Sequence, residues 1–317
     1  MNINIYDVSK KAGVSIATVS RVLNGNTRVS EKTRDKVINA MKELDYTPNV
    51  FARGLGLNTM KTIGIMCIDS SDIYLANAVY YLEQELRKYN YDSILCCTGK
   101  DYNNKKNYLE LLLSKRVDGI ILAGSQFVEN TSKHNNDYII NAAKDVPIVL
   151  VNGYLDADNI YSVMCNDEEA VYNATKLLIN NSHRNIVYLY TSTSYSGMNK
   201  YRGYLKAINE AGITLPDEFH HLCGKNISHA RDYLTYLYDK GMKFDAVMTS
   251  DDSIAAGAVK FAHTHGIRIP EDLEVIGYND SVLSLCTEPE LTSIDSKVEE
   301  LSSCAVSVLM KVLSGED

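Results

Sequence analysis

Residues 4–24, NIYDVSKKAGVSIATVSRVLN, decide the fold of the N-terminal part of the chain. Asn4, with Asp7 three residues later, can cap a first helix, and Gly13 is a usual helix stop. Ser15, followed by Thr18, can open a second helix only two residues after that glycine. So short a connection between two short helices is typical of a helix-turn-helix.

A third helix is expected from Ser30, where the sequence Ser-Glu-Lys-Thr supplies a capping residue. Val37, Met41 and Leu44 would share one face of this helix and pack on the first two. Residues 1–46 are therefore predicted to form an all-α helix-turn-helix head that binds DNA.

The second helix is predicted to lie in the major groove of double-stranded DNA, with its N-terminal residues against the base edges. Arginine can bind O6 and N7 of guanine with two hydrogen bonds, while isoleucine and alanine offer apolar contact to a thymine methyl. The candidate base-reading residues are Ile16, Ala17, Ser20 and Arg21. The candidates for phosphate contacts, which set the register on DNA, are Tyr6, Ser15, Thr18, Asn24, Ser30 and Thr33.

The formal net charge of −8 is divided unevenly along the chain. Residues 1–60 hold nine Lys and Arg against five Asp and Glu, whereas the remainder holds 23 against 35. A basic head on an acidic body is expected when only the head contacts a polyanion.

From residue 62 onward, short apolar runs alternate with helical segments, which is typical of parallel α/β sheets. The predicted strands form two series, at 62–68, 93–97, 118–123 and 147–151, and at 185–190, 245–249 and 273–277. The two series predict an α/β body of two Rossmann-like lobes, with chain crossings near 163–166 and 291–294. The N-lobe would comprise about 62–163 and 293–313, and the C-lobe about 164–292, within a body of residues 62–317.

The head resembles that of the LacI/GalR family of transcriptional regulators at residues 6–24, 29–34 and 44–49. The body is similar to the periplasmic binding protein-like fold of the same family, so the resemblance covers essentially the whole chain. It implies a homodimeric repressor that binds a pseudo-palindromic DNA operator and senses a small molecule, most simply a sugar, in the cleft between the lobes. Ile16 and Ala17 are closer to catabolite-control-type members, which leaves open a purine, a sugar phosphate or a protein co-regulator.

Residues 47–61 are predicted to form a hinge helix and linker. The resemblance implies that this helix forms on DNA and enters the minor groove, where Leu55 would wedge between base pairs. Such a short helix is marginal in water on its own, so a plain interdomain linker is the alternative. The residues assigned to the hinge are Asn49, Ala52, Arg53 and Leu55.

Ligands of such sheets bind beyond the carboxyl ends of the strands, where this chain places polar residues. The resemblance implies that Tyr74 packs on the effector while other side chains bond its hydroxyl groups. The candidate effector-binding residues are Ser71, Tyr74, Asn152, Lys200, Asp251, Asn279 and Ser296. Lys200 stands where many family members carry arginine, and lysine cannot reproduce the planar fork of that side chain.

Other classes of protein fit the sequence poorly. No run of 18 apolar residues and no secretory signal appear, and the seven cysteines show no C-x-x-C spacing, so a cytoplasmic protein without membrane contact is expected. Asp251 and Asp252 are adjacent and cannot face each other, residues 54–59 lack the third glycine of a dinucleotide motif, and the histidines lack metal-ligand spacing. No enzyme activity, cofactor or metal is therefore expected. A ligand-binding module without DNA activity is the other alternative, against which residues 1–55 argue.

Overall fold

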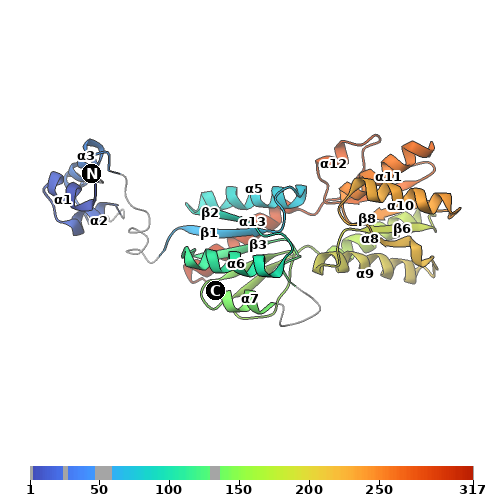
Figure 1. Ribbon diagram of the computed structural model, residues 1–317, viewed down its shortest axis with the longest axis horizontal. Coiled ribbons are helices and arrows are strands. Elements are labelled where there is room, and N and C mark those ends of the chain that lie inside the picture. The colour runs from blue at the N-terminus through green and yellow to red at the C-terminus, as the bar shows by residue number, and fades with distance from the viewer. Residues whose placement is uncertain (1–2, 24–27, 47–58, 129–135, 317) are drawn as a thin grey trace.

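The structure is a computed structural model that describes residues 3–23, 28–46, 59–128 and 136–316 (Figure 1). The head consists of α1 (Ile5–Ala12), α2 (Ile16–Leu23) and α3 (Glu31–Glu43). Val8, Val19 and Val37, one from each helix, are fully buried at its centre. The three predicted helices and their small shared core are thus confirmed.

Local capping explains where the head helices begin and end. The Oδ1 atom of Asn4 accepts a hydrogen bond from the N–H of Tyr6, and Asp7 Oδ2 accepts one from the N–H of Asn4, which forms a capping box. Gly13 ends α1 with φ of 66°, in the left-handed region that glycine adopts without steric cost. Only Val14 and Ser15 then separate Gly13 from α2, which is the tight turn that the motif requires.

The N-lobe is a five-stranded parallel sheet with the strand order β2-β1-β3-β4-β5. Its strands are β1 (Thr62–Cys67), β2 (Asp92–Cys97), β3 (Gly119–Ala123), β4 (Ile148–Val151) and β5 (Ile160–Val163). One face is covered by α5 (Ile73–Lys88) and α13 (Val298–Ser314), and the other by α6 (Tyr102–Ser114) and α7 (Asp137–Ala142). Because helices cover both faces, the central strand β3 is buried at every residue.

The C-lobe repeats this architecture with the strand order β10-β9-β8-β6-β7. Its strands are β6 (Ile186–Tyr190), β7 (His220–Leu222), β8 (Ala246–Thr249), β9 (Glu274–Tyr278) and β10 (Thr292–Ile294). The helices α8 (Asp167–Asn180) and α9 (Tyr195–Glu210) cover one face, and α10 (Ile227–Asp239) and α11 (Asp252–His265) cover the other. Two short helical segments, η2 (Asp217–Phe219) and α12 (Val282–Leu285), complete it.

The chain passes between the lobes at two places, from β5 into α8 and from β10 into α13. The first crossing lies directly after β5, close to the predicted 163–166, whereas the second lies after β10, beyond the predicted 291–294, because residues 292–294 pair with β9 in the C-lobe sheet. The two lobes lie side by side in Figure 1. The sequence did not predict the short strands β5, β7 and β10. Each lies at a sheet edge and is largely half-buried or exposed, so none carries a continuous apolar run.

Among the described residues, no helix has the length and apolar character needed to cross a membrane.

Candidate effector cleft and nucleic-acid interface

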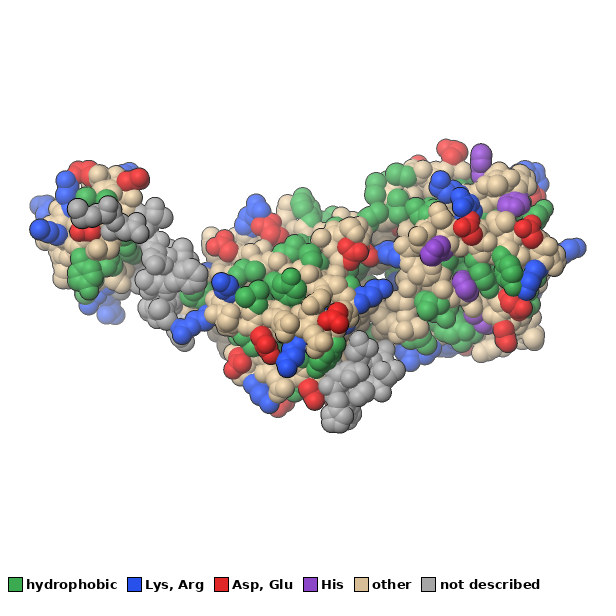
Figure 2. Space-filling view, viewed as in Figure 1, with side chains coloured by type: hydrophobic (Ala, Val, Ile, Leu, Met, Phe, Trp, Pro, Cys, Tyr) green, Lys and Arg blue, Asp and Glu red, His purple; other side chains and the backbone are tan. Residues whose placement is uncertain are grey.

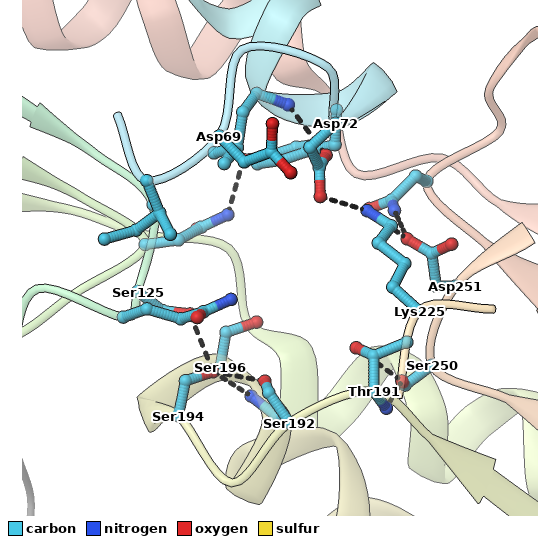
Figure 3. A pocket seen from close by; sticks show the side chains of 18 of the residues that line it. Asp69, Asp72, Ser125, Thr191, Ser192, Ser194, Ser196, Lys225, Ser250 and Asp251 are labelled. Atoms are coloured by element: carbon cyan, nitrogen blue, oxygen red, sulfur yellow. Dashed lines mark hydrogen bonds and ion pairs between the residues drawn. The ribbon is translucent and has the colours of Figure 1, made fainter. Parts of the chain in front are cut away.

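A cleft opens between the two lobes, at the carboxyl ends of both sheets (Figure 3). Five of the predicted effector residues line it, namely Tyr74, Asn152, Lys200, Asp251 and Asn279. Several polar residues that the sequence did not single out line it as well, among them Asp69, Asp72, Lys100, Ser125, Thr191, Ser192, Ser194, Ser196, Lys225 and Ser250. The walls are therefore largely polar, with contributions from both lobes.

Two of the predicted effector residues do not line the cleft. The N–H and hydroxyl of Ser71 both donate to Asp69 Oδ1, at 2.9 and 2.7 Å, so Asp69 holds this side chain. Ser296 is buried between β10 and α13, where its carbonyl accepts a hydrogen bond from the thiol of Cys165. Ser296 belongs to the second segment that crosses between the lobes, and it therefore lies away from the cleft wall.

Asn152 links the N-lobe wall to the first crossing. Its Nδ2 donates to the hydroxyl of Tyr74 at 2.7 Å, and its Oδ1 accepts from the N–H of Cys165 at 3.1 Å. Burial raises the pKa of the Tyr74 hydroxyl well above its ordinary value, so that hydroxyl stays protonated. Because it accepts from Asn152, its own proton is available to donate to a ligand.

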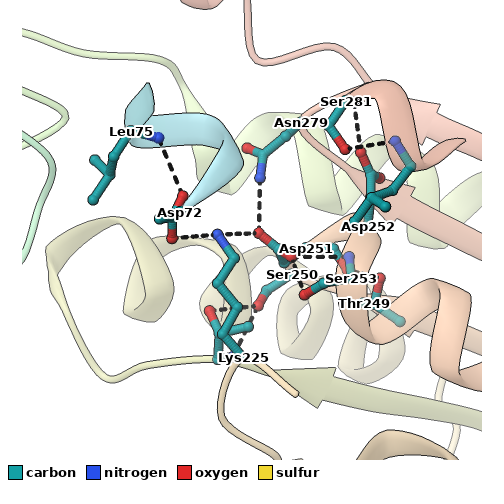
Figure 4. Close-up of polar contacts among 12 residues, drawn as sticks. Asp72, Leu75, Lys225, Thr249, Ser250, Asp251, Asp252, Ser253, Asn279 and Ser281 are labelled. Atoms are coloured by element: carbon teal, nitrogen blue, oxygen red, sulfur yellow. Dashed lines mark hydrogen bonds and ion pairs between the residues drawn. The ribbon is translucent and has the colours of Figure 1, made fainter. Parts of the chain in front are cut away.

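Asp251 is held by four donors at the start of α11 (Figure 4). Its Oδ1 accepts from the N–H and hydroxyl of Ser253 at 2.9 and 2.5 Å, and its Oδ2 accepts from Asn279 Nδ2 at 3.0 Å and Lys225 Nζ at 2.8 Å. This side chain therefore caps the helix and also presents a fixed negative charge to the cleft.

Asp252, the next residue, points away from the cleft. Its carboxylate accepts from the N–H of Ser281 at 2.7 Å and from the hydroxyl of Ser293 at 2.5 Å. Burial raises the pKa of Asp252, although these hydrogen bonds oppose that shift. The two adjacent carboxylates thus have separate structural partners and do not form an acid–base pair, as their spacing predicts.

Lys225 is the most informative residue that the sequence analysis missed. It precedes α10 in the C-lobe, and its Nζ lies 2.5 Å from Asp72 Oδ2 in the N-lobe. A second contact between the lobes is the hydrogen bond from Ser125 Oγ to Ser194 Oγ, at 2.8 Å. Lys225 follows β7, a strand that was not predicted, so the strand-end rule could not nominate it.

The head presents the predicted DNA-contacting surface to solvent. Ile16, Ala17 and Arg21 on α2 are exposed and Ser20 is half-buried. Ser15 Oγ and Ser30 Oγ lie 2.9 Å from Thr18 Oγ1 and Thr33 Oγ1 and cap α2 and α3, and Tyr6 is 67% exposed. Lys and Arg side chains are visible at the surface of the head in Figure 2.

Five of the predicted DNA-contacting residues lie outside the described residues, namely Asn24, Asn49, Ala52, Arg53 and Leu55.

Two family descriptions, both of the LacI family, together match most of the chain. Residues 4–49 match "Bacterial regulatory proteins, lacI family", and residues 60–316 match "Periplasmic binding proteins and sugar binding domain of LacI family". An HTH-type transcriptional regulator of Lachnoclostridium phytofermentans is 55% identical over 314 residues, which are 99% of this chain and 94% of that protein. Catabolite control protein A of Priestia megaterium is 31% identical over 320 residues, which are 100% of this chain and 94% of that protein.

Solved structures show the same fold. The lac repressor dimer bound to operator and the anti-inducer ONPF is similar with a TM-score of 0.89 at 24% identity, covering 100% of this chain and 94% of that one. The transcription regulator CcpA of Lactococcus lactis is similar with a TM-score of 0.70 at 26% identity, covering 81% of this chain and 92% of that one. The first likeness spans the whole chain and agrees with a helical head on two parallel-sheet lobes.

Proposed function

Because the chain belongs to the LacI family of bacterial regulatory proteins, it is a DNA-binding transcriptional regulator and not an enzyme, and we propose that it is a homodimeric repressor controlled by a sugar in the interlobe cleft. Two heads of a symmetric dimer would read a pseudo-palindromic operator with half-sites about one helical turn apart. It would act on DNA in the cytoplasm.

The observation that carries the proposal is that both lobes supply polar groups to one cleft. Asp72 and Ser125 of the N-lobe face Lys225 and Ser194 of the C-lobe directly. A ligand that bonds to both walls would change how the two lobes are oriented toward each other. In a dimer this would move the N-lobes and so change how the two hinge segments pair. A coupling free energy of about 1–3 kcal/mol is enough to shift operator occupancy.

A sugar is favoured by the polar walls and by the relatives. Paired carboxylates and amides suit the hydroxyl groups of a sugar. The matched family is described as a sugar binding domain, and the regulator CelR, with a TM-score of 0.72 at 24% identity, is described in complex with cellobiose. The second candidate is a catabolite-control-type regulator that responds to a protein co-regulator, a purine or a sugar phosphate, which the 31% identity to catabolite control protein A favours.

The experiment is a selection of binding sites from random duplex oligonucleotides by the full chain, followed by anisotropy titrations of the selected site with and without sugars. We expect a pseudo-palindrome and a change in its affinity when an effector sugar is present. A chain that enriches no sequence under any condition would contradict the DNA-binding role. An operator affinity that no small molecule changes would contradict the effector role.

The hinge stays a prediction from the family resemblance. Leu55→Ala is expected to weaken binding to the selected operator more than binding to random DNA, since a wedge acts only where the duplex can be kinked. Equal losses on both DNAs would argue for a plain linker.

A further inference from the structure

Two cysteines lie directly opposite each other at the ends of β1 and β2. In the parallel pairing of these strands Cys67 is in register with Cys97, and their Sγ atoms are 3.6 Å apart. Neighbouring strands of a sheet lie about 4.8 Å apart, which is a separation that a disulfide can span. Since an S–S bond is about 2.05 Å long, the two sulfur atoms have to approach by only about 1.5 Å to form one.

The two thiols differ in their access to solvent. Cys97 is exposed on β2, the edge strand of the N-lobe sheet, whereas Cys67 is fully buried on β1 (Figure 1). Burial and the neighbouring thiol of Cys97 raise the pKa of the Cys67 thiol to about 12, so this thiol stays protonated at neutral pH. An oxidant from solution therefore meets Cys97 first, and Cys67 is the thiol that lies behind it.

The cysteines closest to this pair in the sequence and in the fold have other surroundings. Cys96 is adjacent to Cys97, but it is in register with Met66, and successive side chains of a strand point to opposite faces of the sheet. The thiol of Cys165 donates to the carbonyl of Ser296. In the part of the chain that the structure describes, Cys67 and Cys97 are thus the pair of thiols in contact with each other.

The pair lies where β1 and β2 run into the wall of the cleft. Directly beyond the two cysteines, the N–H of Gly99 donates to the carbonyl of Ile68 at 2.9 Å, so the two chain segments stay side by side. Ile68 and Lys100 both line the cleft. A covalent bond between Cys67 and Cys97 would therefore fix two segments of the cleft wall relative to each other.

We propose that Cys67 and Cys97 form a reversible disulfide when the chain meets a hydroperoxide, and that this bridge changes the affinity of the regulator for DNA. Disulfides of cytosolic proteins are usually transient and either catalytic or redox-sensing, and this chain is not an enzyme. The bridge itself is independent of the proposed sugar control. Its effect on DNA binding rests on the proposed coupling between the lobes and the heads.

The bridge forms in two balanced steps with hydrogen peroxide as the oxidant. The thiolate of Cys97 attacks one peroxide oxygen, the O–O bond breaks, and the hydroxide that leaves takes up a proton, so that Cys97 becomes a sulfenic acid. The sulfur of Cys67 then attacks the sulfur of this acid, the S–O bond breaks, and the leaving hydroxide takes the proton of Cys67. The two thiols lose two electrons in total and the peroxide is reduced to two waters. A dithiol reductant reverses the bridge by thiol–disulfide exchange.

The first test maps the bridge in the full chain. The reduced protein is treated with hydrogen peroxide, its free thiols are alkylated, and it is digested with trypsin without reductant and analysed by mass spectrometry. Arg87 and Lys88 separate the two cysteines, so the bridge joins two different tryptic peptides. We expect this cross-linked pair of peptides in the wild-type chain, and we expect dithiothreitol to abolish it.

The neighbouring cysteine provides a matched control for this test. Cys97→Ala is expected to abolish the bridge, while Cys96→Ala, in the same tryptic peptide, is expected to retain it. Because Cys97 is exposed, its replacement is expected to leave the fold intact. In Cys67→Ala the oxidation is expected to stop at the sulfenic acid of Cys97, which dimedone labels. A wild-type chain in which peroxide does not join Cys67 to Cys97 would overturn the inference, and so would a bridge that survives in Cys97→Ala.

The second test measures the binding of the reduced and the oxidised chain to the selected DNA site by anisotropy. We expect oxidation to change the affinity about fivefold or more, and dithiothreitol to restore it. Cys97→Ala, which keeps the exposed Cys286 and Cys304, is expected to show no such change. Equal affinities of the bridged and the reduced chain would overturn the effect on DNA binding. A reduced chain that responds to sugars but forms no bridge would overturn this inference and leave the proposed function intact.

Discussion

The ammonium of Lys225 in the C-lobe lies 2.5 Å from Asp72 Oδ2 in the N-lobe, and 2.8 Å from Asp251 Oδ2 in its own lobe. The side chains of Asp72 and Asp251 are only 15% and 8% exposed, and Lys225 is the cation that forms an ion pair with both of them among the described residues. The pair therefore joins the lobes across the mouth of the cleft (Figure 4). A ligand that enters the cleft has to fit beside this contact or replace it.

Lys225→Met is expected to lower the free energy of unfolding by about 2 kcal/mol, because it leaves two largely buried carboxylates without a counter-charge at a site that is partly open to water. Urea unfolding measures the loss, and a double-mutant cycle with Asp72→Asn isolates the contact between the lobes. Lys240→Met, at the exposed end of α10, is the matched control. A coupling free energy near zero would show that the contact does not stabilise the chain.

The same pair gives a pH dependence with a defined sign. Burial lowers the pKa of Lys225, but the charges and hydrogen bonds of Asp251 and Asp72 raise this pKa by more. The pKa of Lys225 in the folded chain therefore lies above its ordinary value of 10.5. Since the folded chain holds this proton more tightly than the unfolded chain, the contribution is full below about 10.5 and is lost as the pH rises through the folded pKa. The difference in unfolding free energy between wild type and Lys225→Met should therefore stay constant through neutral pH and shrink only in strong alkali. A difference that already vanishes near neutrality would contradict this account.

Arg21→Ala is expected to lower the preference for the correct base pair over the wrong ones by about 1–3 kcal/mol at one position in each half-site. The reason is that a guanine would lose two hydrogen bonds from the arginine. Anisotropy titrations against single-substituted operators measure it. Lys36→Ala, an exposed cation on α3, controls for the loss of one positive charge. Affinity that falls evenly on all sequences would instead make Arg21 a phosphate contact.

Tyr74→Phe is expected to lower the free energy of unfolding by about 1 kcal/mol, since the Nδ2 of Asn152 loses its acceptor. It should also reduce the melting shift caused by an effector, because the cleft loses a hydroxyl donor. Tyr80→Phe, on the same helix but 55% exposed, should change neither quantity. Identical ligand shifts in both variants would place the effector away from Tyr74.

Gly203→Ala is expected to destabilise the C-lobe by about 2 kcal/mol. A Cβ atom at Gly203 would lie 2.2 Å from the carbonyl oxygen of Glu168, so α8 and α9 would have to separate. Gly153→Ala is the control, because its Cβ would make an ordinary 3.6 Å contact with Val128. Thermal unfolding of the two variants measures this loss of stability. Equal melting temperatures would show that α8 and α9 can move apart without destabilising the C-lobe.

The fold was predictable where its signals are local. Caps such as Asn4 and Ser30 and the long apolar run of β3 depend only on neighbouring residues. The strands β5, β7 and β10 were missed because edge strands of three or four residues carry too few apolar side chains to form a pattern.

The site was predictable in part, for a related reason. The strand-end rule identified Tyr74, Asn152 and Asn279, because each closely follows a strand with a clear apolar pattern. The pairing of Asp72 with Lys225 spans 153 residues and depends on how the lobes meet, which no local pattern records.

The helix α13 ties the N-lobe to the last part of the chain. Its fully buried Ala305 and Leu309 pack in one cluster with Ile63 and Leu82, which come from the beginning of the body. During synthesis the N-lobe strands and α5 leave the ribosome first, yet the part of this sheet face that α13 covers stays open until that helix emerges. The C-lobe, contiguous between the two crossings, can close before it. A nascent chain stalled short of residue 298 is therefore expected to expose that apolar face to chaperones, which makes the N-lobe the last part of the body to mature.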